Sequence, residues 1–388
     1  MINTGIIGVG ACGGNITEAS IVLGTVLKDQ DAMLINSSSE DLVSIKMVPG
    51  QNKYKFGRLD GAAKNRSKAF NALKEELPNV LKAIENSISP HKKDIIFIAA
   101  SAGGGTGSGT LPTLAKILHK KYGSLRKDES GKESRTRIVP IVALPAQYEK
   151  GIIQQNALDC IKELAGSFPV VVIDNDRVET DLLEGKYDHL NKETIGNLLK
   201  LIKCDKVSRI GNIDIEDRLS MFDEPGVLVV GSAMIDPEHQ TPLLDGVKRA
   251  IETTPMQADI TSSVARAAVQ YECETELFSV PNITPVQGLF KNVAGIFEGF
   301  YPADGDAEKK TNKVLVAFSG ANFSQKWISE REAIVESSFK VEKQIELNIS
   351  KGNAGLKAKW GSTPEVSGSS SQADDFSDIF GEIEAMQK

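Results

Sequence analysis

The stretch Gly103-Gly104-Gly105-Thr106-Gly107-Ser108-Gly109 is the most informative part of this sequence. It follows Asp94 to Ala100, a short apolar run typical of a buried parallel strand. After it, Thr110 to Tyr122 carries apolar side chains at the spacing of one helix face. Glycine lets a backbone approach a ligand closely, and a helix start offers free N–H groups and a positive dipole end. This order predicts a phosphate-binding loop, with Thr106 and Ser108 as additional hydroxyl donors.

A flexible surface linker would also be rich in glycine and serine. A linker is not expected between a buried strand and an amphipathic helix, so the phosphate-binding interpretation is favoured. The loop is not a Walker P-loop, because no Gly-Lys-Ser or Gly-Lys-Thr follows the glycines.

Length and composition narrow the class of protein. The chain has 388 residues, enough for about two or three domains, and ordinary apolar and charged fractions. A net charge of −7 argues against non-specific DNA binding by the whole body, although a local basic patch or an adaptor protein is compatible with it. The four scattered cysteines favour reduced thiols over disulfides or a zinc site. With neither a signal peptide nor an apolar run of membrane length, we expect a cytoplasmic protein without direct membrane contact.

The N-terminal half alternates strands with helices, which predicts an α/β fold with a doubly wound parallel sheet. A second glycine turn, Gly8 to Asn15, closes the first strand, and polar segments around Asn36 and Asn175 close two others. Ligands of such sheets bind at the carboxyl ends of the strands, so these segments point to one crevice. Strands are expected at Thr4 to Val9, Ala32 to Ile35, Arg137 to Leu144 and Pro169 to Ile173. Helices are expected at about Asn15 to Leu27, from the end of the polar loop Gly57 to Asn65 through about Glu85, and at Gly151 to Leu164.

In the second half of the chain, strands and helices alternate less regularly, which indicates an α+β domain. Strands are expected there at Pro225 to Gly231, Glu276 to Pro281, Ala294 to Phe300 and Lys313 to Phe318. We place a Rossmann-like nucleotide-binding domain at 1–187, a long central helix at 188–206, the α+β C-terminal domain at 207–326, a C-terminal helix at 327–350 and a disordered tail at 351–388. The tail is too poor in apolar residues to fold alone. Its acidic and aromatic end, Asp374 to Phe380, is either a motif that folds on a partner or a solvated tail.

The first glycine turn, Gly8-x-Gly10-x-x-Gly13, matches the dinucleotide fingerprint, which raises the alternative of an NAD-dependent oxidoreductase. Such an enzyme needs an acid at the end of the second strand to hold the ribose, and this strand closes with Asn36 and serines. It also has no need for the richer loop at Gly103 to Gly109. Two glycine loops facing one crevice fit a nucleoside diphosphate or triphosphate better.

The segment Asn212-Ile213-Asp214-Ile215-Glu216-Asp217 brings two acids three residues apart at a helix start. At that spacing Asp214 and Asp217 project in similar directions and can jointly polarise a water or hold a cation. The alternative is an ordinary helix cap, and spacing alone favours the cap.

Taken together, these motifs resemble the tubulin/FtsZ superfamily. Residues Gly103 to Gly109 look like its signature loop, and Asn212-x-Asp214-x-x-Asp217 resembles its synergy loop. The motifs follow the family's order over about residues 1 to 230. Further positions resemble its nucleotide contacts: Gly10, Ala11, Cys12, Gly13 and Asn15 in the first loop, Asn36 after the second strand, Glu149 as the ribose acid, and Asn175 and Asn191 at the guanine base.

The resemblance implies a GTPase that forms head-to-tail filaments, with Mg²⁺ bridging the phosphates of GTP. It also implies a composite active site. One subunit holds GTP or GDP in the loops that contain Gly103, Gly104, Gly105, Thr106, Gly107 and Ser108. The next subunit supplies Asp214 and Asp217, with Asn212 helping, to position the attacking water, as suits phosphoryl transfer.

Within the superfamily, three departures from the cell-division branch look more like TubZ, the plasmid and phage tubulins that segregate DNA. The loop Gly57 to Asn65 lacks the glycine-alanine-glycine contact, a basic residue is missing after Glu149, and the chain ends in a long helix with a mixed tail. The resemblance implies a DNA-bound adaptor for that tail, in a bacterial or phage-infected cytoplasm, with Lys351, Lys357 and Lys359 near Trp360 as contact candidates. A cell-division GTPase and a non-hydrolysing scaffold are the alternatives.

Overall fold

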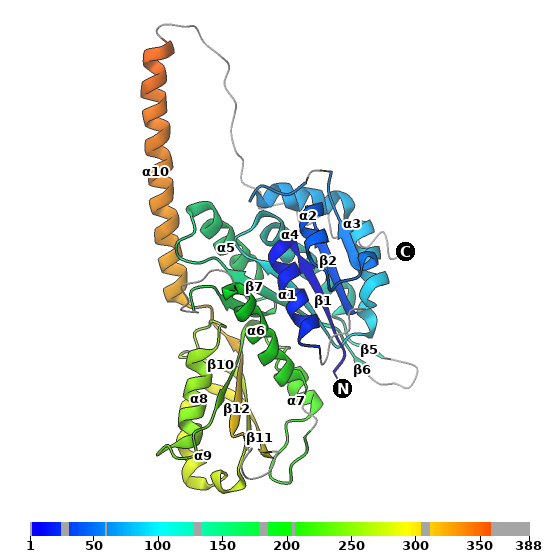
Figure 1. The fold of residues 1–388 in the computed structure, drawn as a ribbon, viewed down its shortest axis with the longest axis vertical. Helices are drawn as coiled ribbons and strands as arrows, with labels where there is room; N and C mark the ends of the chain where they lie inside the picture. Colours follow the sequence, from blue (N-terminus) through cyan, green and yellow to red (C-terminus); the bar gives the residue numbers. More distant parts are fainter. Residues whose placement is uncertain are drawn as a thin grey trace. The chain divides into compact units, whose positions relative to one another are not determined.

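The computed structural model describes residues 2–24, 31–58, 60–127, 133–177, 185–203, 206–303 and 311–357. The chain divides into two compact units, Met1–Ser338 and Phe339–Lys388. All sheet strands lie in the first unit, which Figure 1 shows as a twisted sheet flanked by helices. None of the described helices is both long and apolar enough to cross a membrane.

Within the described residues, ten strands form one sheet in the order β11-β10-β12-β9-β8-β7-β4-β1-β2-β3. From β3 to β9 every pairing is parallel, whereas β12 runs antiparallel to both β9 and β10. The prediction of an α/β fold with a parallel sheet in the N-terminal half is therefore confirmed. The strands are β1 (Thr4–Val9), β2 (Ala32–Asn36), β3 (Lys53–Lys55), β4 (Ile95–Ser101), β7 (Arg137–Leu144), β8 (Pro169–Asp174), β9 (Gly226–Met234), β10 (Val264–Cys273), β11 (Val293–Pro302) and β12 (Lys313–Ala321), with a separate pair β5 (Arg126–Lys127) and β6 (Glu133–Ser134).

Helices cover both faces of the sheet, as βαβ crossovers require. Helix α1 packs against β1, β2 and β4 and touches α6, while α3, α4 and α5 pack side by side. The helices are α1 (Gly10–Val22), α2 (Ser39–Ser44), α3 (Arg66–Ile88), α4 (Gly105–Tyr122), α5 (Gly151–Leu164), α6 (Lys186–Ile202), α7 (Ile215–Ser220), α8 (Pro242–Thr253), α9 (Val280–Gln287) and α10 (Gln325–Lys357).

The order of strands places a crevice beside β1 and β4. These two strands are neighbours, but the chain leaves β1 towards β2 and leaves β4 towards β7, in opposite directions across the sheet. At such a switch point the loops after the strands separate and leave room for a ligand at the carboxyl ends. The strands that carry these loops are almost completely buried, so the crevice rests on a rigid base.

Both glycine-rich helices begin earlier than predicted. Helix α1 starts at Gly10, not near Asn15, and α4 starts at Gly105, not at Thr110. The loop glycines therefore form first helical turns, where close packing against neighbouring backbone outweighs their poor helix propensity.

Pro112 consequently lies inside α4 and not in its first turn. A proline has no N–H for the carbonyl four residues before it, here that of Ser108. The Arg66 guanidinium fills this position, because its Nε and Nη2 donate to the Ser108 carbonyl at 3.3 and 3.0 Å. The helix therefore continues past the proline with this acceptor satisfied.

The C-terminal half differs from the prediction in two places. The segment Glu276 to Pro281 is not a strand: a 3-10 turn at Thr275–Leu277 leads into α9, with Pro281 in its first turn, because proline cannot donate in a sheet ladder. Helix α10 starts at Gln325 and continues through Lys357, past the expected end at 350. The rest of the predicted tail, with Lys359 and Trp360, lies outside the described residues.

Candidate nucleotide-binding site

The two glycine loops meet at the crevice. Gly10 has a φ of +73° at the start of α1, a backbone conformation that favours glycine. A β-carbon at Gly10 would lie 3.6 Å from the backbone nitrogen of Gly107. At Gly13 a β-carbon would lie 2.1 Å from the Ala99 carbonyl oxygen, so only glycine allows α1 this close to β4. The helix starts of α1 and α4 thus lie side by side, as predicted.

The start of α4 leaves its backbone donors available. Its N-cap residue is Gly104, and no side chain caps the first N–H groups. Gly104 and Thr106 are partly exposed, whereas Gly103, Gly105 and Gly107 are buried. Uncapped N–H groups at a helix start form an anion-binding site.

Of the two predicted hydroxyl donors, Thr106 and Ser108, only the first faces the crevice. The Thr106 hydroxyl is 2.8 Å from that of Ser37, which follows β2. The Ser108 side chain is fully buried, and its hydroxyl donates to the Gly104 carbonyl. Ser108 therefore stabilises the first turn of α4, and its hydroxyl does not reach the crevice.

Asn36 also has internal partners. Its amide Nδ2 donates to Asp41 at 3.0 Å, and its Oδ1 accepts from the Ser38 N–H at 3.1 Å. The side chain is buried and shapes the turn that presents Ser37. The last residue of β2 is thus an asparagine and not an acid, which agrees with the argument against a dinucleotide ribose.

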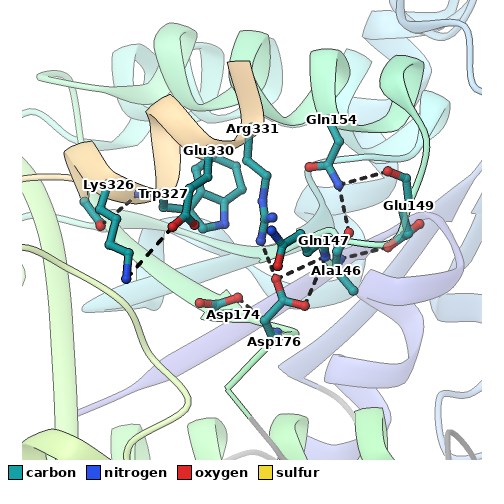
Figure 2. Close-up of polar contacts among 11 residues, drawn as sticks. Ala146, Gln147, Glu149, Gln154, Asp174, Asp176, Lys326, Trp327, Glu330 and Arg331 are labelled. Carbon is teal, nitrogen blue, oxygen red and sulfur yellow. Dashed lines mark hydrogen bonds and ion pairs between the residues drawn. The ribbon is translucent and has the colours of Figure 1, made fainter. Parts of the chain in front are cut away.

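Cys12 and Glu149 lie close enough for an electrostatic interaction. Burial, and then the negative charge of Glu149, raise the pKa of the Cys12 thiol to about 12. Cys12 is therefore a neutral thiol at physiological pH. Glu149 accepts from the Ala146 N–H at 3.0 Å, a contact drawn in Figure 2, and this bond fixes the turn after β7.

A cavity of about 370 Å³ between α1 and α6 is lined by Asn15, predicted in the first nucleotide loop, and by Asn191, predicted at the base. Asn191 is buried, and Tyr187 lines the same cavity one helical turn earlier. The Tyr187 hydroxyl is 2.9 Å from that of Tyr148, and burial followed by Tyr148 raises the Tyr187 pKa. Tyr187 is not among the residues predicted for the site. Its spacing of four residues from Asn191 on one helix face is the sequence signal that points to it.

The Asn175 segment is fixed by its neighbour Asp176 (Figure 2). The Asp176 carboxylate accepts from the Gln147 N–H at 3.0 and 3.1 Å and from Arg331 of α10. Arg331 is 2% exposed and packs over the Trp327 ring at 5.3 Å. Asp176 therefore ties together the turns after β7 and β8 and the start of α10. The role of Arg331 had no local sequence signal.

Asp214 and Asp217 form a reciprocal cap on α7. The Asp217 N–H donates to Asp214 Oδ1 at 2.8 Å, and the Asp214 N–H donates to Asp217 Oδ2 at 3.2 Å. Asn212 exchanges two hydrogen bonds with the Ser208 backbone, at 2.7 and 2.5 Å. The cap favoured by spacing alone is thus present, and each carboxylate keeps one oxygen without a hydrogen bond from the described residues.

These acids lie away from the glycine loops of their own chain. Helix α7 precedes β9 and so lies at the amino end of the parallel strands, whereas the glycine loops follow the carboxyl ends of β1 and β4. Figure 1 shows α7 and the start of α4 at different ends of the sheet. Within one chain, therefore, the structure brings together the predicted nucleotide contacts but not the predicted catalytic acids.

This fold and site define a class of protein. Residues 3–181 match the model of the Tubulin/FtsZ family, GTPase domain. The chain as a whole has the tubulin/FtsZ fold. Members of the family are GTPases.

Individual relatives share the greater part of the chain. The tubulin-like protein CetZ of Pyrococcus abyssi is 27% identical over 327 residues, covering 81% of this chain and 84% of the relative. A GTPγS-bound protofilament of CetZ2 from Haloferax volcanii superposes with a TM-score of 0.70 at 21% identity, covering 88% of this chain and 100% of that one. A GTPγS-form protofilament of Bacillus thuringiensis serovar israelensis TubZ superposes with a TM-score of 0.73 at 16% identity, covering 90% of this chain and 94% of that one. At such identities the structural likeness to CetZ2 and TubZ shows the fold alone, so the finer prediction of a TubZ stays a prediction.

Proposed function

We propose that this protein is a GTPase that assembles head to tail into filaments and hydrolyses GTP at the junction between subunits. The observation that carries the proposal is the placement of two half-sites. An uncapped glycine cradle lies at the carboxyl end of the parallel sheet, and a pair of acids lies at its amino end. Stacking subunits along the strand direction places the acids of one against the cradle of the next.

In the cradle, the N–H groups at the starts of α1 and α4 bind the phosphates, and Thr106 adds a hydroxyl. Asn15 and Asn191 read the base beside the Tyr187 ring, with Asn175 at the adjoining turn, and Glu149 contacts the ribose. GDP would occupy the same contacts after hydrolysis.

A Mg²⁺ ion carried by the phosphates fits these residues better than a resident metal does. The part of the chain that the structure describes holds no group of three His, Cys, Asp or Glu side chains that could bind a metal. Mg²⁺ at nucleotide phosphates needs few protein ligands, and the Thr106 hydroxyl, 2.8 Å from that of Ser37, lies in the first turn of α4. When bound, the ion neutralises part of the phosphate charge.

At the opposite end, the free oxygens of Asp214 and Asp217 accept hydrogen bonds from the attacking water and orient it towards the neighbour's terminal phosphate. The cap bonds hold both carboxylates in place, so capping and catalysis are compatible. Positioning and charge stabilisation are the main contributions to phosphoryl transfer. A non-hydrolysing scaffold would use the same acids as caps only.

The test is GTP turnover measured against protein concentration, with light scattering for assembly. We expect turnover to rise steeply above a threshold concentration and Asp217→Ala to form longer-lived filaments with turnover reduced at least tenfold. Asp217→Asn separates charge from capping, because an amide oxygen can still accept from the Asp214 N–H. Glu216→Ala, an exposed neighbour on α7, is the control and should leave turnover unchanged. Turnover linear in protein concentration, or no preference for GTP over NAD, would contradict the proposal.

DNA segregation through a tail-bound adaptor is a second candidate. It is supported by the length of α10, Gln325–Lys357, and by the sequence features that resemble TubZ. The proposed filament does not depend on a role in DNA segregation. It does not depend on a role in cell division either, and no observation on the described residues favours that role.

A further inference from the structure

Two tyrosine hydroxyls meet beside the cavity between α1 and α6. Tyr148 follows β7, Tyr187 lies in the first turn of α6, and their hydroxyl oxygens are 2.9 Å apart. Tyr187 lines the cavity, whereas Tyr148 is 61% exposed and is not among the lining residues. The proposed function gives a role to the Tyr187 ring and none to Tyr148. An effect of the Tyr148 hydroxyl on the site would therefore pass through Tyr187.

The turn that carries Tyr148 is fixed on both sides of this residue. On one side, the Gln147 N–H donates to the Asp176 carboxylate at 3.0 and 3.1 Å. On the other side, the Glu149 N–H donates to the Ala146 carbonyl at 3.1 Å, and the Ala146 N–H donates to the Glu149 carboxylate at 3.0 Å. Figure 2 draws the side-chain contacts of this turn. The backbone of Tyr148 therefore has a defined position, and its hydroxyl can serve as a fixed anchor.

The start of α6 has fewer restraints of its own. Its N-cap residue, Gly185, has a φ of +84° and offers no side chain to cap the first N–H groups. Within the described residues, the Tyr187 hydroxyl bonds to that of Tyr148 and to no other group. A hydrogen bond at the far end of a tyrosine ring restricts the first side-chain torsion, and so fixes the direction in which the ring points. Loss of the Tyr148 hydroxyl would free the Tyr187 ring to turn away from the cavity.

The surroundings of the Tyr187 hydroxyl keep it neutral. Burial, and then the hydrogen bond with Tyr148, raise the pKa of Tyr187, and the negative charges of Glu149 and Asp176 act in the same direction. The hydroxyl therefore keeps its proton at physiological pH and can donate or accept. Because Glu149 and Asp176 follow β7 and β8, the hydroxyl pair lies where these two turns approach α6.

We propose that Tyr148 is a positioning residue, whose hydroxyl holds the Tyr187 ring against the base of the nucleotide. This inference rests on the proposed function, because it takes the cavity between α1 and α6 as the place of the base. A ring that is held in place before binding loses less entropy when it stacks on a base. Stacking needs the face of a base and not a particular edge, so Tyr148 should affect how tightly a nucleotide binds and not which base is preferred.

Calorimetric titration of the full chain with GDP tests this role without turnover. We expect Tyr148→Phe to bind GDP about three- to tenfold more weakly than the wild type, the usual range for one hydrogen bond. Tyr187→Phe loses the same hydrogen bond and should be weakened equally. The double variant Tyr148→Phe/Tyr187→Phe should bind no more weakly than either single variant, because this bond can be lost only once.

A second ligand and a matched variant complete the test. Inosine diphosphate lacks the amino group of guanine, and its affinity should fall by the same factor as that of GDP in Tyr148→Phe. Tyr54→Phe removes another tyrosine hydroxyl, which bonds to Glu76 at 3.0 Å outside the cavity, and should bind GDP like the wild type.

Equal binding of GDP by Tyr148→Phe and the wild type would overturn the proposal, and so would additive weakening in the double variant. Equal weakening by Tyr54→Phe would assign the effect to a general loss of stability. A changed ratio of GDP to inosine diphosphate affinity would mean that Tyr148 reads the base itself and does not act through Tyr187. Failure of these variants leaves the GTPase proposal intact, whereas a wild type that does not bind GDP would contradict both proposals.

Discussion

Asp174 illustrates how a single buried carboxyl group beside the site affects stability. It ends β8, is 4% exposed and accepts the Asp176 N–H at 3.0 Å. Burial, and then the charge of Asp176, raise its pKa, while that hydrogen bond and two arginines lower it less. An acid with a raised pKa in the folded state costs stability once it ionises. Its penalty is therefore absent below the unfolded pKa of about 3.9 and develops fully as pH rises through the folded pKa.

Asp174→Asn keeps the accepting oxygen but removes the buried charge. We expect this variant to melt at a higher temperature than the wild type at pH 7, with the difference vanishing near pH 4. Melting temperatures measured from pH 4 to pH 8 check the sign. The matched control is Asp188→Asn, which removes an exposed carboxylate from α6. If the variant still melts at a higher temperature than the wild type at pH 4, the gain comes from the shape of the asparagine side chain and not from the titration of Asp174.

Helix α10 is the element whose attachment to the site is least visible in the sequence. Trp327, Arg331 and Val335 recur every four residues and are all buried, so this face of the helix packs against the rest of the first unit. Arg331 then reaches Asp176, which fixes the turn beside the proposed base contacts (Figure 2). A change in this helix should therefore alter the binding of the nucleotide.

We expect Arg331→Met to lower the free energy of unfolding by about 2 kcal/mol, the usual value of a hydrogen bond to a charged group. It should also raise KM for GTP more than it lowers kcat, because Asp176 positions the binding turns and not the attacking water. Denaturant unfolding and steady-state kinetics measure both. Lys326→Met removes an exposed charge from the same helix and should change neither quantity. Loss of stability with an unchanged KM would make Arg331 purely structural.

At the level of the whole molecule, one continuous sheet joins the two predicted domains. Strand β9 pairs with β8 on one side and with β12 on the other, so the half-sites at opposite ends of the sheet share a rigid frame. The first unit ends at Ser338, within α10. The proposed assembly thus needs the first unit, whereas the second candidate function needs the residues after Ser338.

A chain that ends at Ser338 should separate these two functions. It keeps Trp327, Arg331 and Val335, so we expect cooperative unfolding and concentration-dependent GTP turnover within about twofold of the full chain. If the protein segregates DNA, the replicon that carries its gene should be lost faster in cells with this truncation. A matched Asp217→Ala strain gives the loss rate without hydrolysis. Unchanged replicon loss in the truncated strain would remove the second candidate.

Sequence alone determined the features that local chemistry controls. Residues Gly103 to Gly109 between a buried strand and an amphipathic helix predicted the phosphate cradle, and alternating strands and helices predicted the parallel sheet. The prediction of the sheet is confirmed, because apolar periodicity acts over a few residues, whereas the phosphate cradle stays a prediction. The sequence did not predict the early starts of α1 and α4, because tertiary packing of glycines against neighbouring backbone decided where these helices begin.

Only the tertiary structure decided which distant side chains meet. Arg331 joins Asp176 across 155 residues of chain. This pair has no sequence motif, because burial and charge pairing depend on which faces the fold brings together. The sequence predicted two half-sites, Gly103 to Gly109 and Asp214 to Asp217. The sheet placed them at opposite ends, and for that physical reason a single chain holds each half of the proposed site without joining them.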